Sequence, residues 1–179
     1  MNTMTLWCRR ESPLGTLRLV ARDGALVGVY FDGQKYDARA GADWREAPGD
    51  ALLRAAAQQL DEYFAGRRRR FDLRLAPSGT AFQRDVWRAI AAVPAGSTIS
   101  YAELARRVGR PTSVRAAGAA TGRNPLSIVV PCHRIVGAGG ALTGYAGGLE
   151  RKRALLALEC AAPPVQRGAT EPRSARDAA

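Results

Sequence analysis

The residues best suited to chemistry in this chain are a cysteine and the only histidine, which stand side by side as Cys132 and His133. A thiolate is a strong nucleophile, and a nearby imidazole or a helix start lowers the pKa of a thiol. Neighbours in a regular strand point to opposite faces, so the two side chains can cooperate only where the backbone turns. Pro131 precedes them and cannot donate to a strand ladder. We therefore expect a buried strand over 128–130 that ends at Pro131, with Cys132 opening a turn or a short helix.

The first half of the chain has the pattern of a small sheet followed by a helix. Short runs rich in β-branched and apolar residues, separated by turn residues, predict strands at 6–10, 16–22, 25–31 and 71–75. Asp23-Gly24 is typical of a tight hairpin turn. Residues 33–49 are polar and predict a loop. Helical periodicity over 50–64 predicts a helix with Asp50 as its N-cap.

The second half of the chain is mainly helical. Apolar periodicity between Pro and Gly breaks predicts helices at 80–93, 100–108, 113–121 and 149–158. The two middle helices are joined by a tight turn with glycine, as in a helix-turn-helix. The second of them consists mostly of Ala and Gly, with Arg115 as its one long charged side chain, which suits close approach to a groove.

Residues 76–79 form the best candidate linker, because Pro, Ser and Gly follow one another there. The sequence therefore predicts an N-terminal domain over 1–76 and a second domain over 77–162. Residues 163–179 contain Pro, Arg, Ser and Ala without periodicity, and we expect a disordered tail.

Charge and composition narrow the class of protein. The chain has 179 residues and a net charge of +11, and residues 77–162 alone contain 11 Lys or Arg against 4 Asp or Glu. A basic domain is the electrostatic footprint of nucleic-acid binding, although an Arg-rich protein without that function is equally compatible with the charge. No apolar run approaches the roughly 20 residues of a membrane span, and no signal peptide precedes the strands. Three scattered cysteines predict neither disulfides nor a metal site, so we expect a reducing cytoplasm.

Seven short motifs of the second half stand in the order and spacing of one known family. They are residues 82–87, 100–105, 114–118, 123–125, 130–136, 143–148 and 152–159. Together they resemble the O6-alkylguanine-DNA alkyltransferases of the bacterial Ogt type, also called methylated-DNA–protein-cysteine methyltransferases. The first half resembles them more loosely, at 12–15 and 63–66. The resemblance implies an α/β (α+β) fold, with an N-terminal ribonuclease-H-like antiparallel sheet domain and a C-terminal helical domain of winged-helix, helix-turn-helix type.

The resemblance also implies a reaction that each molecule performs once. Cys132 would take the alkyl group from guanine O6, and possible further substrates include O4-alkylthymine. His133, linked to the thiol through water and steadied by Glu159, would take the thiol proton. Tyr101 would donate a hydrogen bond to O6. No cofactor is implied, because the alkyl donor is the DNA itself.

The remaining site residues are also implied by the resemblance. Asn124 at a hinge turn and Lys152 in the last helix would support the catalytic network. Arg115 would fill the gap left when the target base is flipped out of the duplex. The implied DNA contacts are Ser100, Tyr101, Arg115, Ala116, Gly118 and Arg123. The implied pocket residues are Val130, Pro131, Tyr145, Ala146 and Gly147. The partner would be double-stranded DNA containing O6-alkylguanine, bound by a monomer, with cooperative binding left open.

Three other functions fit parts of the sequence. A protein that recognises alkylated bases without repairing them would have the helix-turn-helix but would replace Cys132. A cysteine hydrolase would use the Cys132–His133 pair, but it needs an oxyanion hole and leaves the basic helix-turn-helix unexplained. A transcriptional regulator would need side chains that read base edges, and the helix over 113–121 offers few.

Overall fold

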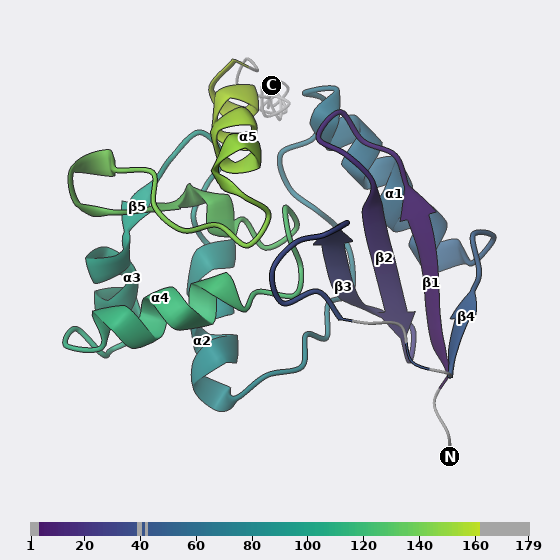
Figure 1. Ribbon diagram of the computed structural model, residues 1–179, viewed down its shortest axis with the longest axis horizontal. Helices are drawn as coiled ribbons and strands as arrows, with labels where there is room; N and C mark the ends of the chain where they lie inside the picture. Colours follow the sequence, from purple (N-terminus) through teal and green to yellow (C-terminus); the bar gives the residue numbers. More distant parts are fainter. Residues whose placement is uncertain (1–3, 39–40, 42, 162–179) are drawn as a thin grey trace, which may run out of the picture.

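The structure of the chain, a computed structural model, describes residues 4–38, 41 and 43–161. A sheet half and a helical half lie side by side (Figure 1). The fold is mixed α+β, as the sequence predicts.

The N-terminal sheet has four strands in the order β3-β2-β1-β4. The strands are β1 (Thr5–Arg10), β2 (Leu17–Arg22), β3 (Ala25–Phe31) and β4 (Trp44–Glu46). The first three form the predicted antiparallel meander, and β4 adds to β1 in parallel. Asp23 and Gly24 both have positive φ, 52° and 67°, as the predicted hairpin turn requires. The prediction of a loop over all of 33–49 is wrong at β4.

Helix α1 (Ala51–Phe64) lies against one face of this sheet (Figure 1). Asp50 is its N-cap, as predicted, and its side chain accepts a hydrogen bond from the Leu53 amide. The helix buries Leu53, Ala56, Leu60 and Tyr63. The last of these places a phenol at the end of α1 that is nearest the C-terminal helix.

The predicted strand over 71–75 is not formed. The segment runs beside β3, and only Leu75 makes a bridge, to Leu26. The Leu26 amide donates to Arg74 O at 2.8 Å and the Ala76 amide donates to Leu26 O at 3.0 Å. Alternation of apolar and polar residues is present, but the chain stays alongside β3 for too short a distance to build a ladder.

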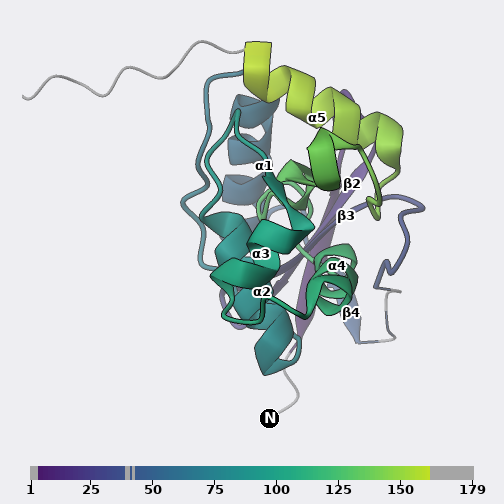
Figure 2. The ribbon, with the colours of Figure 1, turned by 90° about the vertical axis from the view of Figure 1, so that its left-hand side faces the viewer.

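The helical half contains all four predicted helices, with ends that differ by a few residues. They are α2 (Ala81–Ala91), α3 (Tyr101–Arg107), α4 (Val114–Gly122) and α5 (Leu149–Ala161). Two short strands, β5 (Ile99–Ser100) and β6 (Ile135–Val136), pair in parallel beside them. Short 3₁₀ helices are η1 (Cys132–Arg134) and η2 (Ala138–Gly140). In Figure 2, which faces this half, α5 crosses above α2, α3 and α4. None of the helices within the described residues is long and apolar enough to cross a membrane.

The predicted strand over 128–130 is wrong, because the chain makes consecutive turns there. Ile128 has a φ of 71°, which is unusual for a β-branched residue and requires support from its surroundings. The Val129 amide donates to Ser127 O and the Val130 amide donates to Leu126 O, both at 2.8 Å. A short apolar run signals burial but does not distinguish a strand from a buried turn.

The two halves meet where this turn lies against the outer edge of β3. The Val29 amide donates to Pro125 O at 2.8 Å, and the Ser127 amide donates to Val29 O at 3.0 Å. Backbone hydrogen bonds therefore fix the turn before Cys132 to the sheet, although the two segments are almost a hundred residues apart in the chain.

Substitution of Trp87 tests how α2 is held to α4. Trp87 is buried, and its Nε1 donates to Ala120 O at 2.9 Å. Trp87→Phe removes this bond and leaves a void, so we expect the free energy of unfolding in urea to fall by about 1–2 kcal/mol. Trp44→Phe, in β4 at the edge of the sheet opposite β3, should change the free energy of unfolding by less than about 0.5 kcal/mol. Equal effects of the two substitutions would contradict this role of Trp87.

Candidate active site

Cys132 is the first residue of η1, as the sequence predicts for a cysteine that opens a short helix. Its residue surface is 5% exposed. The nearest polar partner of its sulfur is Asn124, whose Nδ2 lies 3.1 Å from Sγ. The thiol therefore faces an amide donor inside the protein, where a thiolate would be stabilised.

Asn124 holds both sides of the turn that carries the thiol. Its Oδ1 accepts a hydrogen bond from the Leu126 amide at 3.0 Å. Its Nδ2 donates to Val130 O at 2.8 Å as well as to Sγ of Cys132. One amide side chain thus uses a donor and an acceptor to fix the turn and to aim a proton at the sulfur.

Burial raises the pKa of the Cys132 thiol, and this effect outweighs the opposing influence of Asn124, of Lys152 and of nearby backbone amides. At rest the side chain is consequently a neutral thiol rather than a thiolate. A nucleophilic reaction at this sulfur needs a base to take its proton.

His133 has the properties of such a base. Its side chain is fully buried, and its Nε2 lies 2.8 Å from Oε1 of Glu159. Burial lowers the pKa of His133 against the opposing effect of Glu159, so the imidazole is neutral. Because Nε2 faces a carboxylate, it carries the proton, and Nδ1 keeps its lone pair. Nδ1 is buried and hydrogen bonds none of the described residues, which leaves it open to a proton carried by water.

The Glu159 carboxylate is the most heavily hydrogen-bonded group of the site. The Arg134 guanidinium donates two hydrogen bonds to it, from Nε to Oε2 at 2.9 Å and from Nη2 to Oε1 at 2.8 Å. The Tyr63 hydroxyl donates to Oε1 at 2.8 Å, and the Gly96 amide donates to Oε2 at 3.3 Å. Burial raises the pKa of Glu159, but the bonds from His133 and Arg134 prevail and hold the pKa far below its usual range.

Lys152 is buried near the same centre. Its Nζ donates to three carbonyls, those of Ile135 at 2.5 Å, Thr143 at 2.9 Å and Gly144 at 3.3 Å. Burial lowers the pKa of Lys152. The ammonium joins the strand that follows η1 to the loop over 143–148, so it fixes the predicted pocket loop next to Cys132.

Two tyrosines lie near the thiol. The Tyr101 hydroxyl donates to Thr143 O at 3.2 Å, and burial is the main cause that raises the pKa of Tyr101. A Cβ on Gly118 of α4 would lie 3.6 Å from the Tyr101 ring, an ordinary van der Waals contact, so the two helices pack closely at this point. Burial, together with the nearby Cys132, raises the pKa of Tyr145 well above its usual value.

The other predicted pocket residues surround these tyrosines. Val130, Pro131 and Gly147 are buried, and Ala146 is partly exposed. A Cβ on Gly147 would lie 2.8 Å from the Tyr145 ring and 3.1 Å from Phe31, so only glycine fits between the two aromatic rings.

The predicted DNA-binding residues occupy different settings. Arg115 and Ala116 are exposed on α4, whereas Ser100 is the N-cap of α3 and accepts a hydrogen bond from the Glu103 amide. Arg123 is exposed, and its guanidinium lies over the Tyr36 ring at 4.7 Å. The structure thus gives Ser100 and Arg123 partners within the protein, and it leaves Arg115 facing solvent.

Comparison with known proteins agrees with this geometry. Residues 81–161 match the family described as "6-O-methylguanine DNA methyltransferase, DNA binding domain", and residues 6–77 match its "ribonuclease-like domain". A methylated-DNA–protein-cysteine methyltransferase of Mycolicibacterium paratuberculosis is 49% identical over 150 residues, which are 83% of this chain and 88% of that protein. The chain belongs to the 6-O-methylguanine DNA methyltransferase family.

Solved structures of this methyltransferase family have the same fold. A crystal structure of Mycobacterium tuberculosis OGT in complex with DNA has a TM-score of 0.82 and 42% identity, covering 89% of this chain and 95% of that one. An O6-methylguanine DNA methyltransferase from Methanococcus jannaschii, at 22% identity, shares the fold with a TM-score of 0.65 over 90% of this chain and 98% of its own.

Two residues of the methyltransferase site were not predicted from the sequence. Arg134 follows His133 directly, and its place within the motif was an available signal. Tyr63 was noted only as part of a loose resemblance, and it reaches Glu159 across 96 positions of the chain. No local pattern could indicate that contact.

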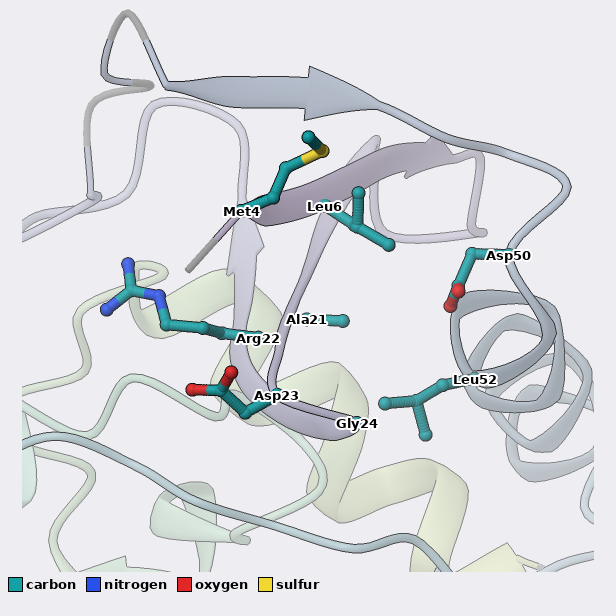
Figure 3. A pocket seen from close by; sticks show the side chains of 8 residues that line it. All are labelled: Met4, Leu6, Ala21, Arg22, Asp23, Gly24, Asp50 and Leu52. Atoms are coloured by element: carbon teal, nitrogen blue, oxygen red, sulfur yellow. The ribbon is translucent and has the colours of Figure 1, made fainter. Parts of the chain in front are cut away.

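A pocket in the sheet half is separate from this site. It lies between the start of β1, the Asp23–Gly24 hairpin and the start of α1 (Figure 3). Its lining is Met4, Leu6, Ala21, Arg22, Asp23, Gly24, Asp50 and Leu52. It shares no residue with the network around Cys132 and Glu159.

Thiol reactivity in the free methyltransferase tests the resting state of Cys132. Cys160 is exposed, whereas Cys132 is buried with a raised pKa. We expect iodoacetamide to modify Cys160 at least about tenfold faster than Cys132 at neutral pH, measured by peptide mass spectrometry over time. In urea the two rates should converge. A folded protein in which Cys132 reacts as fast as Cys160 would contradict a buried neutral thiol.

Proposed function

We propose that this methyltransferase repairs DNA by moving the alkyl group of O6-alkylguanine irreversibly to Sγ of Cys132, once per molecule. The observation that carries the proposal is a buried thiol that meets Asn124 and is followed in the chain by a buried histidine, whose Nε2 lies 2.8 Å from the buried Glu159 carboxylate. The names of its relatives, and the crystallisation of the Mycobacterium tuberculosis protein with DNA, support the choice of substrate.

The chemistry follows from the protonation states. His133 Nδ1 takes the proton of the Cys132 thiol through a water molecule, and Glu159 stabilises the imidazolium that forms. The sulfur attacks the alkyl carbon, a carbon–sulfur bond forms, and the carbon–O6 bond breaks with its electron pair going to guanine. Tyr101 hydrogen bonds O6 of the leaving guanine anion, which takes one proton from water, while the His133 imidazolium returns its proton to water. The thioether is stable, so no second turnover follows and no cofactor is needed.

Asn124 and Lys152 prepare the site for the same step. The Asn124 amide donates to the sulfur and stabilises the thiolate as the proton leaves. Lys152 contributes positive charge near the sulfur and holds the loop that contains Tyr145, Ala146 and Gly147. These residues, with Val130 and Pro131, wall the space for the flipped base.

We propose that DNA binds along α4 and the surrounding basic surface. The small residues Ala116 and Gly118 let the helix enter a groove, and Arg115 fills the gap left by the flipped base. In this proposal Ser100, Tyr101 and Arg123 contact the DNA beside α4. The ligand is double-stranded DNA containing O6-alkylguanine, and the protein acts as a cytoplasmic monomer.

Mass spectrometry of the intact protein tests the transfer itself. After incubation with a duplex containing O6-methylguanine, we expect the wild type to gain about one methylene mass on Cys132. Cys132→Ser should gain none. Tight binding of the duplex without any gain in mass would mean that the protein recognises the lesion but does not repair it.

Substitution of Arg115 separates base flipping from chemistry. Arg115→Ala should slow transfer from duplex DNA about tenfold or more, a loss of about 1.4 kcal/mol or more of transition-state stabilisation. Transfer from a free O6-benzylguanine base, which needs no flipping, should stay unchanged. Arg45→Ala, at an exposed arginine of β4 in the sheet half, is the matched control and should leave both rates unchanged. Equal losses on duplex and free base would contradict the role given to Arg115.

A further inference from the structure

Tyr63 is the one described side chain of the sheet half that hydrogen bonds the Glu159 carboxylate. It lies near the end of α1, is 2% exposed, and donates from its hydroxyl to Oε1 at 2.8 Å. We propose that Tyr63 is a positioning residue that adjusts the proton affinity of His133 through Glu159. This inference rests on the proposed function, because it concerns the base of the same reaction.

The geometry of Oε1 carries the argument. This one oxygen accepts from Tyr63, from Nε2 of His133 and from Nη2 of Arg134, each at 2.8 Å. Each donor takes a share of the negative charge that would otherwise stabilise an imidazolium. The phenol therefore limits how strongly Glu159 favours the charged form of His133, and it also fixes the plane in which the carboxylate meets the ring.

The phenol acts only as a donor. Burial, then the neighbouring Glu159, raises the pKa of Tyr63 far above its usual value, so the hydroxyl stays protonated. The other charged groups that act on His133 are Glu159 and Lys152, both from α5, and its chain neighbour Arg134 in η1. Arg69, in the segment after α1, donates to Glu159 O at 3.1 Å.

Tyr63 also packs as an ordinary core residue. Its ring lies 5.5 Å from that of Phe64 and 5.6 Å from that of Phe71, measured between centroids. Tyr63→Phe keeps these contacts and removes only the hydroxyl. The substitution can therefore distinguish a role through Glu159 from a role in packing.

The direction in which the His133 pKa should change follows from how the negative charge on Glu159 Oε1 is shared among its donors. Without the hydroxyl, more of the charge on Oε1 faces His133, the imidazolium is stabilised, and the pKa of His133 rises. At a given acidic pH a smaller fraction of His133 is then neutral and able to take the thiol proton. The acid limb of the transfer rate should accordingly move to higher pH, while the rate at alkaline pH changes little.

The experiment uses the full chain and its single histidine. Because His133 is the only histidine, its ring signals in a proton–carbon NMR titration report its pKa without assignment. We expect the His133 pKa to rise in Tyr63→Phe and the rate of methyl transfer at pH about 6 to fall roughly threefold to tenfold. Tyr30→Phe removes a phenol from β3, outside the Glu159 network, and should leave both quantities unchanged.

Three outcomes decide the inference. An unchanged His133 titration in folded Tyr63→Phe overturns it, as does an equal shift in Tyr30→Phe. In a Glu159→Gln background, the additional effect of Tyr63→Phe should vanish, and its persistence overturns a path through the carboxylate.

If Tyr63→Phe does not fold, 3,5-difluorotyrosine at position 63 is a stronger donor of similar size and should lower the His133 pKa. A wild type that transfers no methyl group would defeat the proposed function, yet the titration would still report the coupling.

Discussion

Burial of the Glu159 charge is the constraint around which the site is built. A carboxylate removed from water loses several kcal/mol of solvation unless donors replace it. Arg134, His133, Tyr63 and a backbone amide supply them, and they come from α1, from η1 and from the segment after α2. Tyr63 is the donor that the sheet half supplies, so the full set of bonds to the carboxylate forms only when the two halves pack together.

The same low-polarity surroundings hold the reacting pair in its neutral form. Burial raises the pKa of Cys132 and lowers the pKa of His133, so a thiol and a neutral imidazole coexist at rest. Transfer of one proton then creates a thiolate and an imidazolium at once. Asn124 stabilises the thiolate, and Glu159 stabilises the imidazolium. A protein that reacts only once benefits from this arrangement, because a permanently ionised thiolate would be consumed by any small electrophile.

The parts that the sequence predicts well are those governed by local physics. The Asp23–Gly24 hairpin, the Asp50 cap and the helices follow from turn chemistry, capping and periodicity, and the prediction that Cys132 opens a short helix is confirmed. The predicted strand over 128–130 failed because its apolar residues are buried in turns held by long-range contacts. The resemblance placed His133 and Glu159 in one network, but no spacing in the sequence could predict the Tyr63 contact.

The turn before Cys132 shows why the placement of the thiol depends on both halves of the protein. A positive φ at Ile128 costs conformational energy, and it persists because neighbouring bonds leave the chain no relaxed alternative. On one side the Asn124 side chain hydrogen bonds Val130 O of the turn and the Cys132 sulfur. On the other side the backbone of Val29 hydrogen bonds the backbone of the turn. The sheet half therefore supplies two kinds of support: backbone bonds that aim the thiol, and a phenol that holds the carboxylate behind the base. A helical half without the sheet would keep Cys132, His133 and Glu159 in its sequence, but it would lose the contacts that fix the distances between them.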